Sequence, residues 1–148
     1  GSGDLGESIA YKIAEQLKNN CLIILHYNSN KTKAEQIAGD IKNKYGCKTD
    51  IINARFLKIQ EDEQFVKFIN KTKHVVTIED GIRIGGLSSN IQNLILSNNL
   101  ENIRLKTFGY PEKFIEHGTV EQLEKKYMLD KYAIAKNISN WLKNIEKD

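Results

Sequence analysis

The sequence predicts an α/β fold, a three-layer α/β/α arrangement whose mainly parallel sheet has about four strands. Two observations carry this prediction. The spacing of apolar residues switches repeatedly between helical and strand-like periods. A short continuous apolar run, at Cys21–Leu25, is typical of a strand covered on both faces. Strands that alternate with helices favour a parallel, Rossmann-like sheet with right-handed crossovers.

The first third of the chain is predicted to form helix, strand, helix and strand. Apolar residues recur every four positions from 5 to 17, which indicates an amphipathic helix. Cys21–Leu25 is the first strand. The second helix extends from Ala34 to Tyr45, and Gly46 is placed to end it because glycine readily adopts the left-handed conformation of a helix C-cap. A second strand follows at about 48–56.

The middle of the chain is predicted to form a further helix, strand and helix. Apolar residues at 65–69 indicate a short helix, and His74–Ile78 is the third strand. A fourth helix contains Ile91–Ile95. Ser88 or Ser89 is expected to cap its start, because a serine hydroxyl can accept a hydrogen bond from a free N–H of the first turn.

The last segment is predicted to add one strand and one long helix. Ile103–Phe108 alternates in polarity, which is typical of a strand nearer the sheet edge, and Pro111 ends it. Thr119 with Gln122 is a capping-box pattern, and Asp130 is placed to cap a helix extending to Ile145. There is no internal repeat, low-complexity segment or linker, so residues 1–148 are predicted to form a single domain.

Composition excludes several classes of protein. The 148 residues are 40% hydrophobic and 28% charged, as in soluble globular domains, and their net charge of +3 comes from mixed rather than clustered charges. A nucleic-acid partner is therefore not expected. No apolar run is long enough to span a membrane and no leader-like segment is present, so no membrane partner is expected either and the predicted location is cytoplasmic.

The two cysteines, Cys21 and Cys47, are too few for a metal motif or a disulfide framework. Each opens an apolar strand, so both are predicted to be reduced, buried thiols. Because the two strands could be neighbours, an adventitious bridge between these cysteines stays open. No metal site is predicted.

Four separated motifs, at 52–57, 79–89, 109–119 and 127–130, occur in the order that is found in a known family. On these motifs, residues from about 51 to 145 resemble the C-terminal domain of 1-deoxy-D-xylulose-5-phosphate synthase, a transketolase-type enzyme. The sequence departs from the family at Ile59, where a proline is usual, and at Met128, where the family has Tyr-Gly-Leu-Asp.

The resemblance implies a transketolase C-terminal-like fold and a module without catalytic residues. In the family the thiamine diphosphate and Mg²⁺ lie in other domains, and this sequence lacks the Gly-Asp-Gly segment that holds them. In the family this domain supports the dimer, so a homodimer is a possible assembly. The parent reaction joins pyruvate to glyceraldehyde 3-phosphate for isoprenoid synthesis. This chain alone is expected to be inactive, and whether it catalyses anything stays open.

The segments Gly3–Gly6, Leu25–Lys31 and Lys33–Glu35 carry a second resemblance. On these segments, residues from about 3 to 50 resemble the N-terminal, Rossmann part of a short-chain dehydrogenase/reductase. In that family a glycine turn holds the cofactor pyrophosphate, and a polar segment after the second strand suits the 2′-phosphate of NADP. The corresponding NADP-binding candidates are Gly3, Gly6, Asn28 and Ser29. The change of resemblance at 48–54 suggests a chimera of a 1–50 segment with a 51–148 segment. The alternative is a single-family protein with a divergent first third.

The turn after the third strand is the best candidate for ligand binding. Backbone N–H groups at a helix start, together with two hydroxyls, suit a phosphate or carboxylate, so the anion-binding candidates are Gly85, Gly86, Ser88 and Ser89. The alternative is that the glycines permit a tight turn and the serines only cap the helix. Glu79 and Asp80 are expected to form a solvated turn rather than an acid/base pair.

The remaining polar candidates favour structural roles. His117 is the best single polar residue, and we expect it to shape its loop rather than to take part in catalysis. A reductase would need a Tyr-x-x-x-Lys pair. The sequence has this pattern twice, at Tyr127/Lys131 and Tyr132/Lys136, within a lysine-rich stretch, so its specificity is low.

Overall fold

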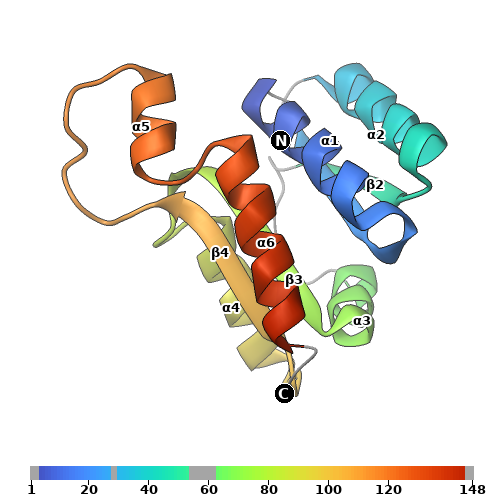
Figure 1. The fold of residues 1–148 in the computed structure, drawn as a ribbon. Helices are drawn as coiled ribbons and strands as arrows, with labels where there is room; N and C mark the ends of the chain where they lie inside the picture. The colour runs from blue at the N-terminus through green and yellow to red at the C-terminus, as the bar shows by residue number, and fades with distance from the viewer. Residues whose placement is uncertain (1–3, 28–29, 54–62, 146–148) are drawn as a thin grey trace. The chain divides into compact units, whose positions relative to one another are not determined.

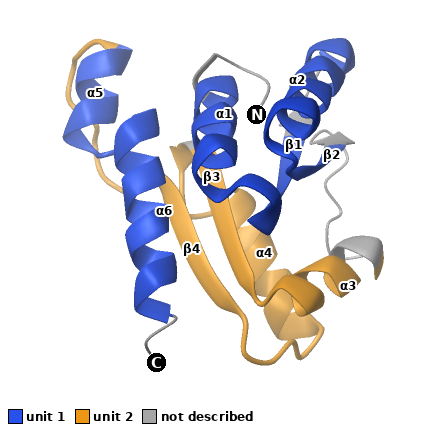
Figure 2. Cartoon of the chain, turned by 45° about the vertical axis from the view of Figure 1, so that its right-hand side comes forward, with its two compact units in different colours: residues 1–56, 120–148 blue, residues 57–119 orange. Residues whose placement is uncertain are grey.

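The protein is described by a computed structural model that places residues 4–27, 30–53 and 63–145 (Figure 1). Helices and parallel strands alternate along the chain, so the α/β fold class is confirmed. The residues cluster into two compact units: unit 1 comprises residues 1–56 and 120–148, and unit 2 comprises residues 57–119 (Figure 2). None of the helices in the described residues is long and apolar enough to cross a membrane.

The described residues of unit 1 form one pair of strands, four α-helices and a short 3-10 helix. In chain order these are α1 (Asp4–Leu17), η1 (Lys18–Asn20), β1 (Leu22–Tyr27), α2 (Lys31–Tyr45), β2 (Lys48–Asn53), α5 (Val120–Lys126) and α6 (Lys131–Ile145). Strands β1 and β2 are parallel, and their register extends from Leu22 opposite Lys48 to Tyr27 opposite Asn53.

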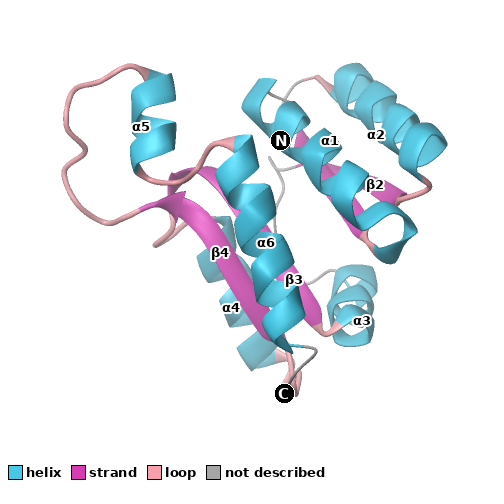
Figure 3. Cartoon of the chain, viewed as in Figure 1, coloured by secondary structure: helices cyan, strands magenta, loops and turns pink. Residues whose placement is uncertain are grey.

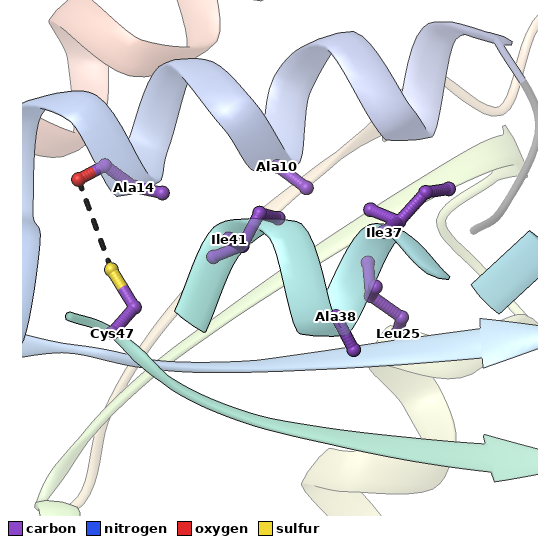
Figure 4. Packing of buried hydrophobic residues seen from close by; sticks show 7 residues of the cluster. All are labelled: Ala10, Ala14, Leu25, Ile37, Ala38, Ile41 and Cys47. Atoms are coloured by element: carbon purple, nitrogen blue, oxygen red, sulfur yellow. Dashed lines mark hydrogen bonds between the residues drawn. The ribbon is translucent and has the colours of Figure 1, made fainter. Parts of the chain in front are cut away.

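The core of unit 1 forms where α1 and α2 pack together and α2 covers the strands. Small alanines on α1 face the isoleucines of α2, which allows the two helices to approach closely (Figure 4). The buried cluster consists of Ala10, Ala14, Leu25, Ile37, Ala38, Ile41 and Cys47. Both cysteines are free thiols; Cys47 is buried as predicted, whereas Cys21 is only half-buried.

The helices of unit 1 are capped by residues close to them in sequence. Gly46 has φ 72° and its N–H donates to the Lys42 carbonyl at 3.0 Å, so α2 ends as predicted. Asp130 caps α6 as predicted, because its Oδ1 accepts from the N–H groups of Tyr132 (2.9 Å) and Ala133 (3.1 Å).

Helix α5 ends in a Schellman motif. Leu129 N–H donates to the Glu124 carbonyl at 2.7 Å, and Met128 N–H donates to the Lys125 carbonyl at 3.2 Å. Met128 is the left-handed residue of the motif, with φ 57°. Position 128 therefore has the left-handed conformation that glycine, the usual residue of the resembled family at this position, adopts readily.

Unit 2 contains the second pair of strands. Its elements are α3 (Glu63–Thr72), β3 (His74–Ile82), α4 (Leu87–Ser97) and β4 (Arg104–Tyr110). Figure 3 shows β3 and β4 side by side, and the two strands are parallel. Ile69 of α3 and Ile91 and Leu94 of α4 form the buried cluster against this pair. Strand β4 ends directly before Pro111, as predicted.

The grouping of the strands differs from the prediction of one sheet. The described strands form two parallel pairs, β1–β2 and β3–β4. Apolar periodicity identifies a strand but not its partner, which is decided by backbone hydrogen bonds between distant segments. The predicted strand at 48–56 ends at Asn53 among the described residues. That residues 1–148 form a single domain stays a prediction.

Candidate functional site

Glu79, near the end of β3, organises the loop that leads into α4. Its Oε2 accepts from the Leu87 N–H at 2.9 Å, and its Oε1 accepts from the Ser88 N–H at 3.3 Å. These N–H groups belong to the first turn of α4, where no intrahelical acceptor exists. A carboxylate also interacts favourably with the positive end of the helix dipole. Glu79 therefore caps α4 from a neighbouring strand.

The two serines of the turn complete this network. The Ser88 hydroxyl lies within hydrogen-bonding distance of Glu79 Oε1 and, at 2.9 Å, of the Arg83 carbonyl. The Ser89 hydroxyl accepts from the Gly85 N–H at 2.9 Å and approaches the same Arg83 carbonyl at 3.3 Å. Both serines therefore make these hydrogen bonds to residues of the same loop and of the preceding strand, which holds the loop in one conformation.

Three glycines make the arrangement sterically possible. Gly85 has φ 78°, a conformation that side chains disfavour. A Cβ at Gly86 would lie 1.9 Å from Glu79 Oε2, and one at Gly109 of β4 would lie 2.8 Å from Arg83 Cγ and 3.0 Å from Glu79 Cγ. The carboxylate reaches the helix because positions 86 and 109 carry no side chain.

Two expectations about this loop are wrong. The N-cap residue of α4 is Gly86, and neither Ser88 nor Ser89 caps the helix from that position, since both lie inside it. Glu79 is half-buried and hydrogen-bonded rather than part of a solvated turn, because β3 continues to Ile82 with an irregular register between Ile78 and Ile82. The side chain of Asp80 lies outside the described part of the chain.

The loop brings together the four predicted anion-binding residues, Gly85, Gly86, Ser88 and Ser89. However, the N–H groups of Leu87 and Ser88 already donate to an internal carboxylate. An external anion at this helix start would have to displace Glu79, and anion binding stays a prediction. The role of Glu79 could have been predicted from the sequence. A glycine pair at the start of a helix supplies no side-chain cap, and an acidic residue on the preceding strand can supply one instead.

Apolar side chains project from the same end of unit 2. Ile82 is 50% exposed, Ile84 is 63% exposed, and Phe114, in the segment after β4, is 85% exposed. Because β3 and β4 are parallel, the segments that follow them leave the same edge of the pair. Large exposed apolar side chains often mark contact surfaces.

The other polar candidates lie elsewhere in the sequence. His117 is exposed in the segment between β4 and α5, and His74 is exposed at the start of β3. In unit 1, Tyr132 is exposed, and the Nζ atom of the neighbouring Lys131 lies 5.3 Å from its ring centroid. That the two Tyr-x-x-x-Lys patterns have a structural rather than a catalytic role stays a prediction.

The reductase-like candidates are only partly described. Gly6 lies in the first turn of α1. Gly3, Asn28 and Ser29 lie outside the described residues. Their proposed contact with NADP stays a prediction.

The described residues do not fit the metal-bound thiamine diphosphate of the resembled enzymes. No group of three or more His, Cys, Asp or Glu side chains that could hold a metal ion occurs among them. Magnesium coordination needs several oxygen ligands around one point.

Comparison with known proteins decides the family. The transketolase C-terminal domain family matches residues 10–134, which is most of the chain. The chain belongs to this family. Its relatives include 1-deoxy-D-xylulose-5-phosphate synthases. That of Caldanaerobacter subterraneus is 40% identical over 101 residues, which cover 68% of this chain and 16% of the relative.

Two further synthases extend the comparison. That of Halothermothrix orenii is 36% identical over 97 residues, covering 66% of this chain and 15% of the relative. That of Syntrophotalea carbinolica is 29% identical over 139 residues, covering 94% of this chain and 22% of the relative. The chain thus spans about a fifth or less of the length of these relatives. The family match passes without a break through residues 48–54, where a junction was predicted.

Proposed function

We propose that the chain is a non-catalytic module that supports a dimer in a protein of the 1-deoxy-D-xylulose-5-phosphate synthase type. The family match and the synthase relatives support the type of module. The observation that carries the dimer role is the loop of unit 2. Glu79, Ser88 and Ser89 form their hydrogen bonds within it, whereas Ile82 and Ile84 face solvent.

A loop with this construction is suited to contact rather than to chemistry. Its polar groups hold the backbone in one shape, so little conformational entropy remains to be lost when a partner binds. Beside the exposed Arg83 it presents the apolar side chains of Ile82 and Ile84, and apolar side chains are typical of the buried centres of protein interfaces. A second copy of the chain is the partner proposed, because the same apolar edge would then be available on both sides of a twofold interface.

The test is the self-association of the chain, measured by sedimentation over a range of concentrations. We expect a dimer that Ile84→Glu weakens by at least about tenfold, because one buried isoleucine contributes about 1.5–3 kcal/mol. Leu96→Glu is the matched control, since Leu96 is 74% exposed but lies near the far end of α4. A chain that stays monomeric at high concentration, or equal weakening by both variants, would contradict the dimer role.

The non-catalytic part of the proposal has its own assay. Incubation with pyruvate, glyceraldehyde 3-phosphate, thiamine diphosphate and Mg²⁺ should produce no 1-deoxy-D-xylulose 5-phosphate. Product formation that depends on the chain would overturn this part while leaving the dimer test unaffected.

The finer proposal for residues 3–50, an NADP-binding segment joined to a synthase-like one, has only the sequence resemblance behind it. The continuous family match across 48–54 favours the single-family alternative. A thermal melt across an NADP⁺ titration tests the segment. A midpoint that rises with ligand concentration, as mass action requires, would restore the reductase interpretation.

A further inference from the structure

Cys21 and Cys47 stand opposite each other at the start of the β1–β2 pair. The register aligns Leu22 with Lys48, so the two cysteines occupy the preceding pair of positions. The Lys48 N–H donates to the Cys21 carbonyl at 3.3 Å, which fixes the two backbones together at this point. The two sulfur atoms lie 3.3 Å apart. Their proximity therefore follows from strand pairing.

This geometry is compatible with a disulfide. Adjacent strands lie about 4.7–4.9 Å apart, within the range of about 4.4–6.8 Å that Cα atoms span in disulfides. The sulfurs must approach by about 1.3 Å to reach the S–S bond length of about 2.05 Å. Side-chain rotation can supply such a movement, so β1 and β2 can remain paired.

The surroundings of the two thiols differ. Cys47 is fully buried, and its Sγ lies 2.6 Å from the Lys18 carbonyl of η1 and 3.8 Å from the Ala14 carbonyl of α1, the contact drawn in Figure 4. Cys21 is half-buried and so is the thiol that an external reagent meets first. Burial, with a further contribution from the hydrogen bond to Cys47, raises the pKa of Cys21 to about 12. Its thiolate is therefore scarce near neutral pH, and its reaction is slow.

We propose that Cys21 and Cys47 form a reversible redox pair that closes to a disulfide by exchange with a small-molecule disulfide. The Cys21 thiolate attacks one sulfur of the reagent and releases one thiol, leaving a mixed disulfide on Cys21. The Cys47 thiolate then attacks the Cys21 sulfur and releases the second thiol. In total, two protein thiols lose their protons and are oxidised to one S–S bond, and the reagent disulfide is reduced to two thiols.

The bridge would join the two ends of the segment that contains β1 and α2. Cys21 follows η1 directly, and Cys47 lies between α2 and β2. The cysteines are 26 residues apart, and the segment between them contains β1 and α2. Oxidation would thus convert this segment into a covalently closed loop that includes α2, the helix that covers β1 and β2 in the unit 1 core.

The experiment is equilibration of the reduced chain in glutathione buffers of graded oxidised-to-reduced ratio, at 25 °C until the composition is constant. Alkylation and intact mass then measure the bridged fraction. We expect the folded chain to bridge at a ratio more reducing than the urea-unfolded chain by on the order of 10²-fold, the preference that loop-closure entropy gives a loop of this length. Equal ratios for both states, or a folded chain that stays alkylatable throughout, would overturn the proposal.

Single variants test the order of the two attacks. Cys47→Ser should accumulate one glutathione on Cys21, because no second thiol is available to resolve the mixed disulfide. Cys21→Ser should remain largely unmodified, since Cys47 is buried. Faster modification of Cys47 than of Cys21 would contradict the proposed sequence. The comparison of folded and unfolded wild-type chains remains decisive if either variant fails to fold.

Discussion

Units 1 and 2 each contain a pair of parallel strands covered by helices, but their helix starts are secured differently. In unit 1, Asn30 caps α2 and Asp130 caps α6, each from the position directly before its helix. In unit 2, the acceptor for the start of α4 is Glu79, eight residues before Leu87 and on a strand. A local cap forms with its helix, whereas a cap from a strand requires the strand and helix to be packed first.

Two glycines, one from each unit, should differ in their tolerance to substitution. Nothing lies within 4 Å of a Cβ built at Gly39 in α2 of unit 1. The equivalent Cβ at Gly86 in unit 2 would overlap the Glu79 carboxylate. Replacement by alanine should therefore have opposite effects at these two positions.

The largest expected effect is that of Gly86→Ala. Its methyl group must displace Glu79, which combines overpacking with the loss of a helix cap and should lower the free energy of unfolding by about 3 kcal/mol. Gly39→Ala is the matched control and should raise it by about 0.5–1 kcal/mol, because alanine is the better helix former. Urea unfolding measures both values. Similar values for the two variants would remove the contrast between the units.

A smaller effect should distinguish the two carboxylate caps. Glu79 uses both oxygens, whereas Asp130 accepts both of its bonds through Oδ1 alone. Glu79→Gln replaces one acceptor by a donor and should cost about 1.5 kcal/mol. Asp130→Asn keeps an equally good cap and should cost less than about 0.5 kcal/mol. Urea unfolding at one pH compares them, and an equal cost would mean that Glu79 does not need both oxygens.

A stabilising change is expected where α5 ends. Met128 has φ 57° and is exposed, so Met128→Gly should relieve left-handed strain and raise the free energy of unfolding by about 0.5 kcal/mol, after the entropy cost of glycine. In unit 2, Asn99 occupies the corresponding position after α4 with φ 49°. Asn99→Gly should change stability less, because asparagine tolerates this conformation. Thermal melts of the two variants provide the test, and a destabilising Met128→Gly would contradict it.

The smallest effect is a pH dependence that arises from Tyr11 in unit 1. Burial, followed by the hydrogen bond to Asp40 at 3.2 Å, raises the pKa of Tyr11 above its usual value of 10.0. A pKa that is raised in the folded state contributes stability below the unfolded pKa and loses it as pH rises further. Ultraviolet titration of phenolate should therefore contain a late component that Tyr11→Phe removes. If the late component persists in this variant, another tyrosine is responsible.

Local signals predicted the fold well, whereas contacts between distant segments were not predicted. Gly46 and Asp130 were identified as caps because they adjoin their helices. The start of α4 was assigned to Ser88 or Ser89 by the same reasoning, but its cap is Glu79, which a local rule does not reach. The opposition of Cys21 and Cys47 was foreseen as a possibility because both open strands.

The sequence located the turn that contains the candidate site, but it did not predict the hydrogen bonds of Glu79 within it. The sequence placed Gly85–Ser89 at a helix start, which the structure confirms. Whether such a start accepts an external anion depends on which side chains reach it, and the path of Glu79 depends on the absence of side chains at Gly86 and Gly109. The lack of side chains at Gly86 and Gly109 affects the path of Glu79 only after β3, β4 and α4 have packed together, so the sequence alone does not reveal it.

The space that Gly109 leaves open has an evolutionary consequence. A Cβ there would meet Arg83 Cγ, Glu79 Cγ and, at 3.0 Å, the Gly81 carbonyl, so β4 packs closely against the end of β3 and the first residue after it. A lineage that acquires a larger residue at 109 must shorten the side chains at 79 and 83 and shift the backbone at 81. Substitutions at position 109 of β4 and at positions 79, 81 and 83 are therefore expected to be correlated among relatives.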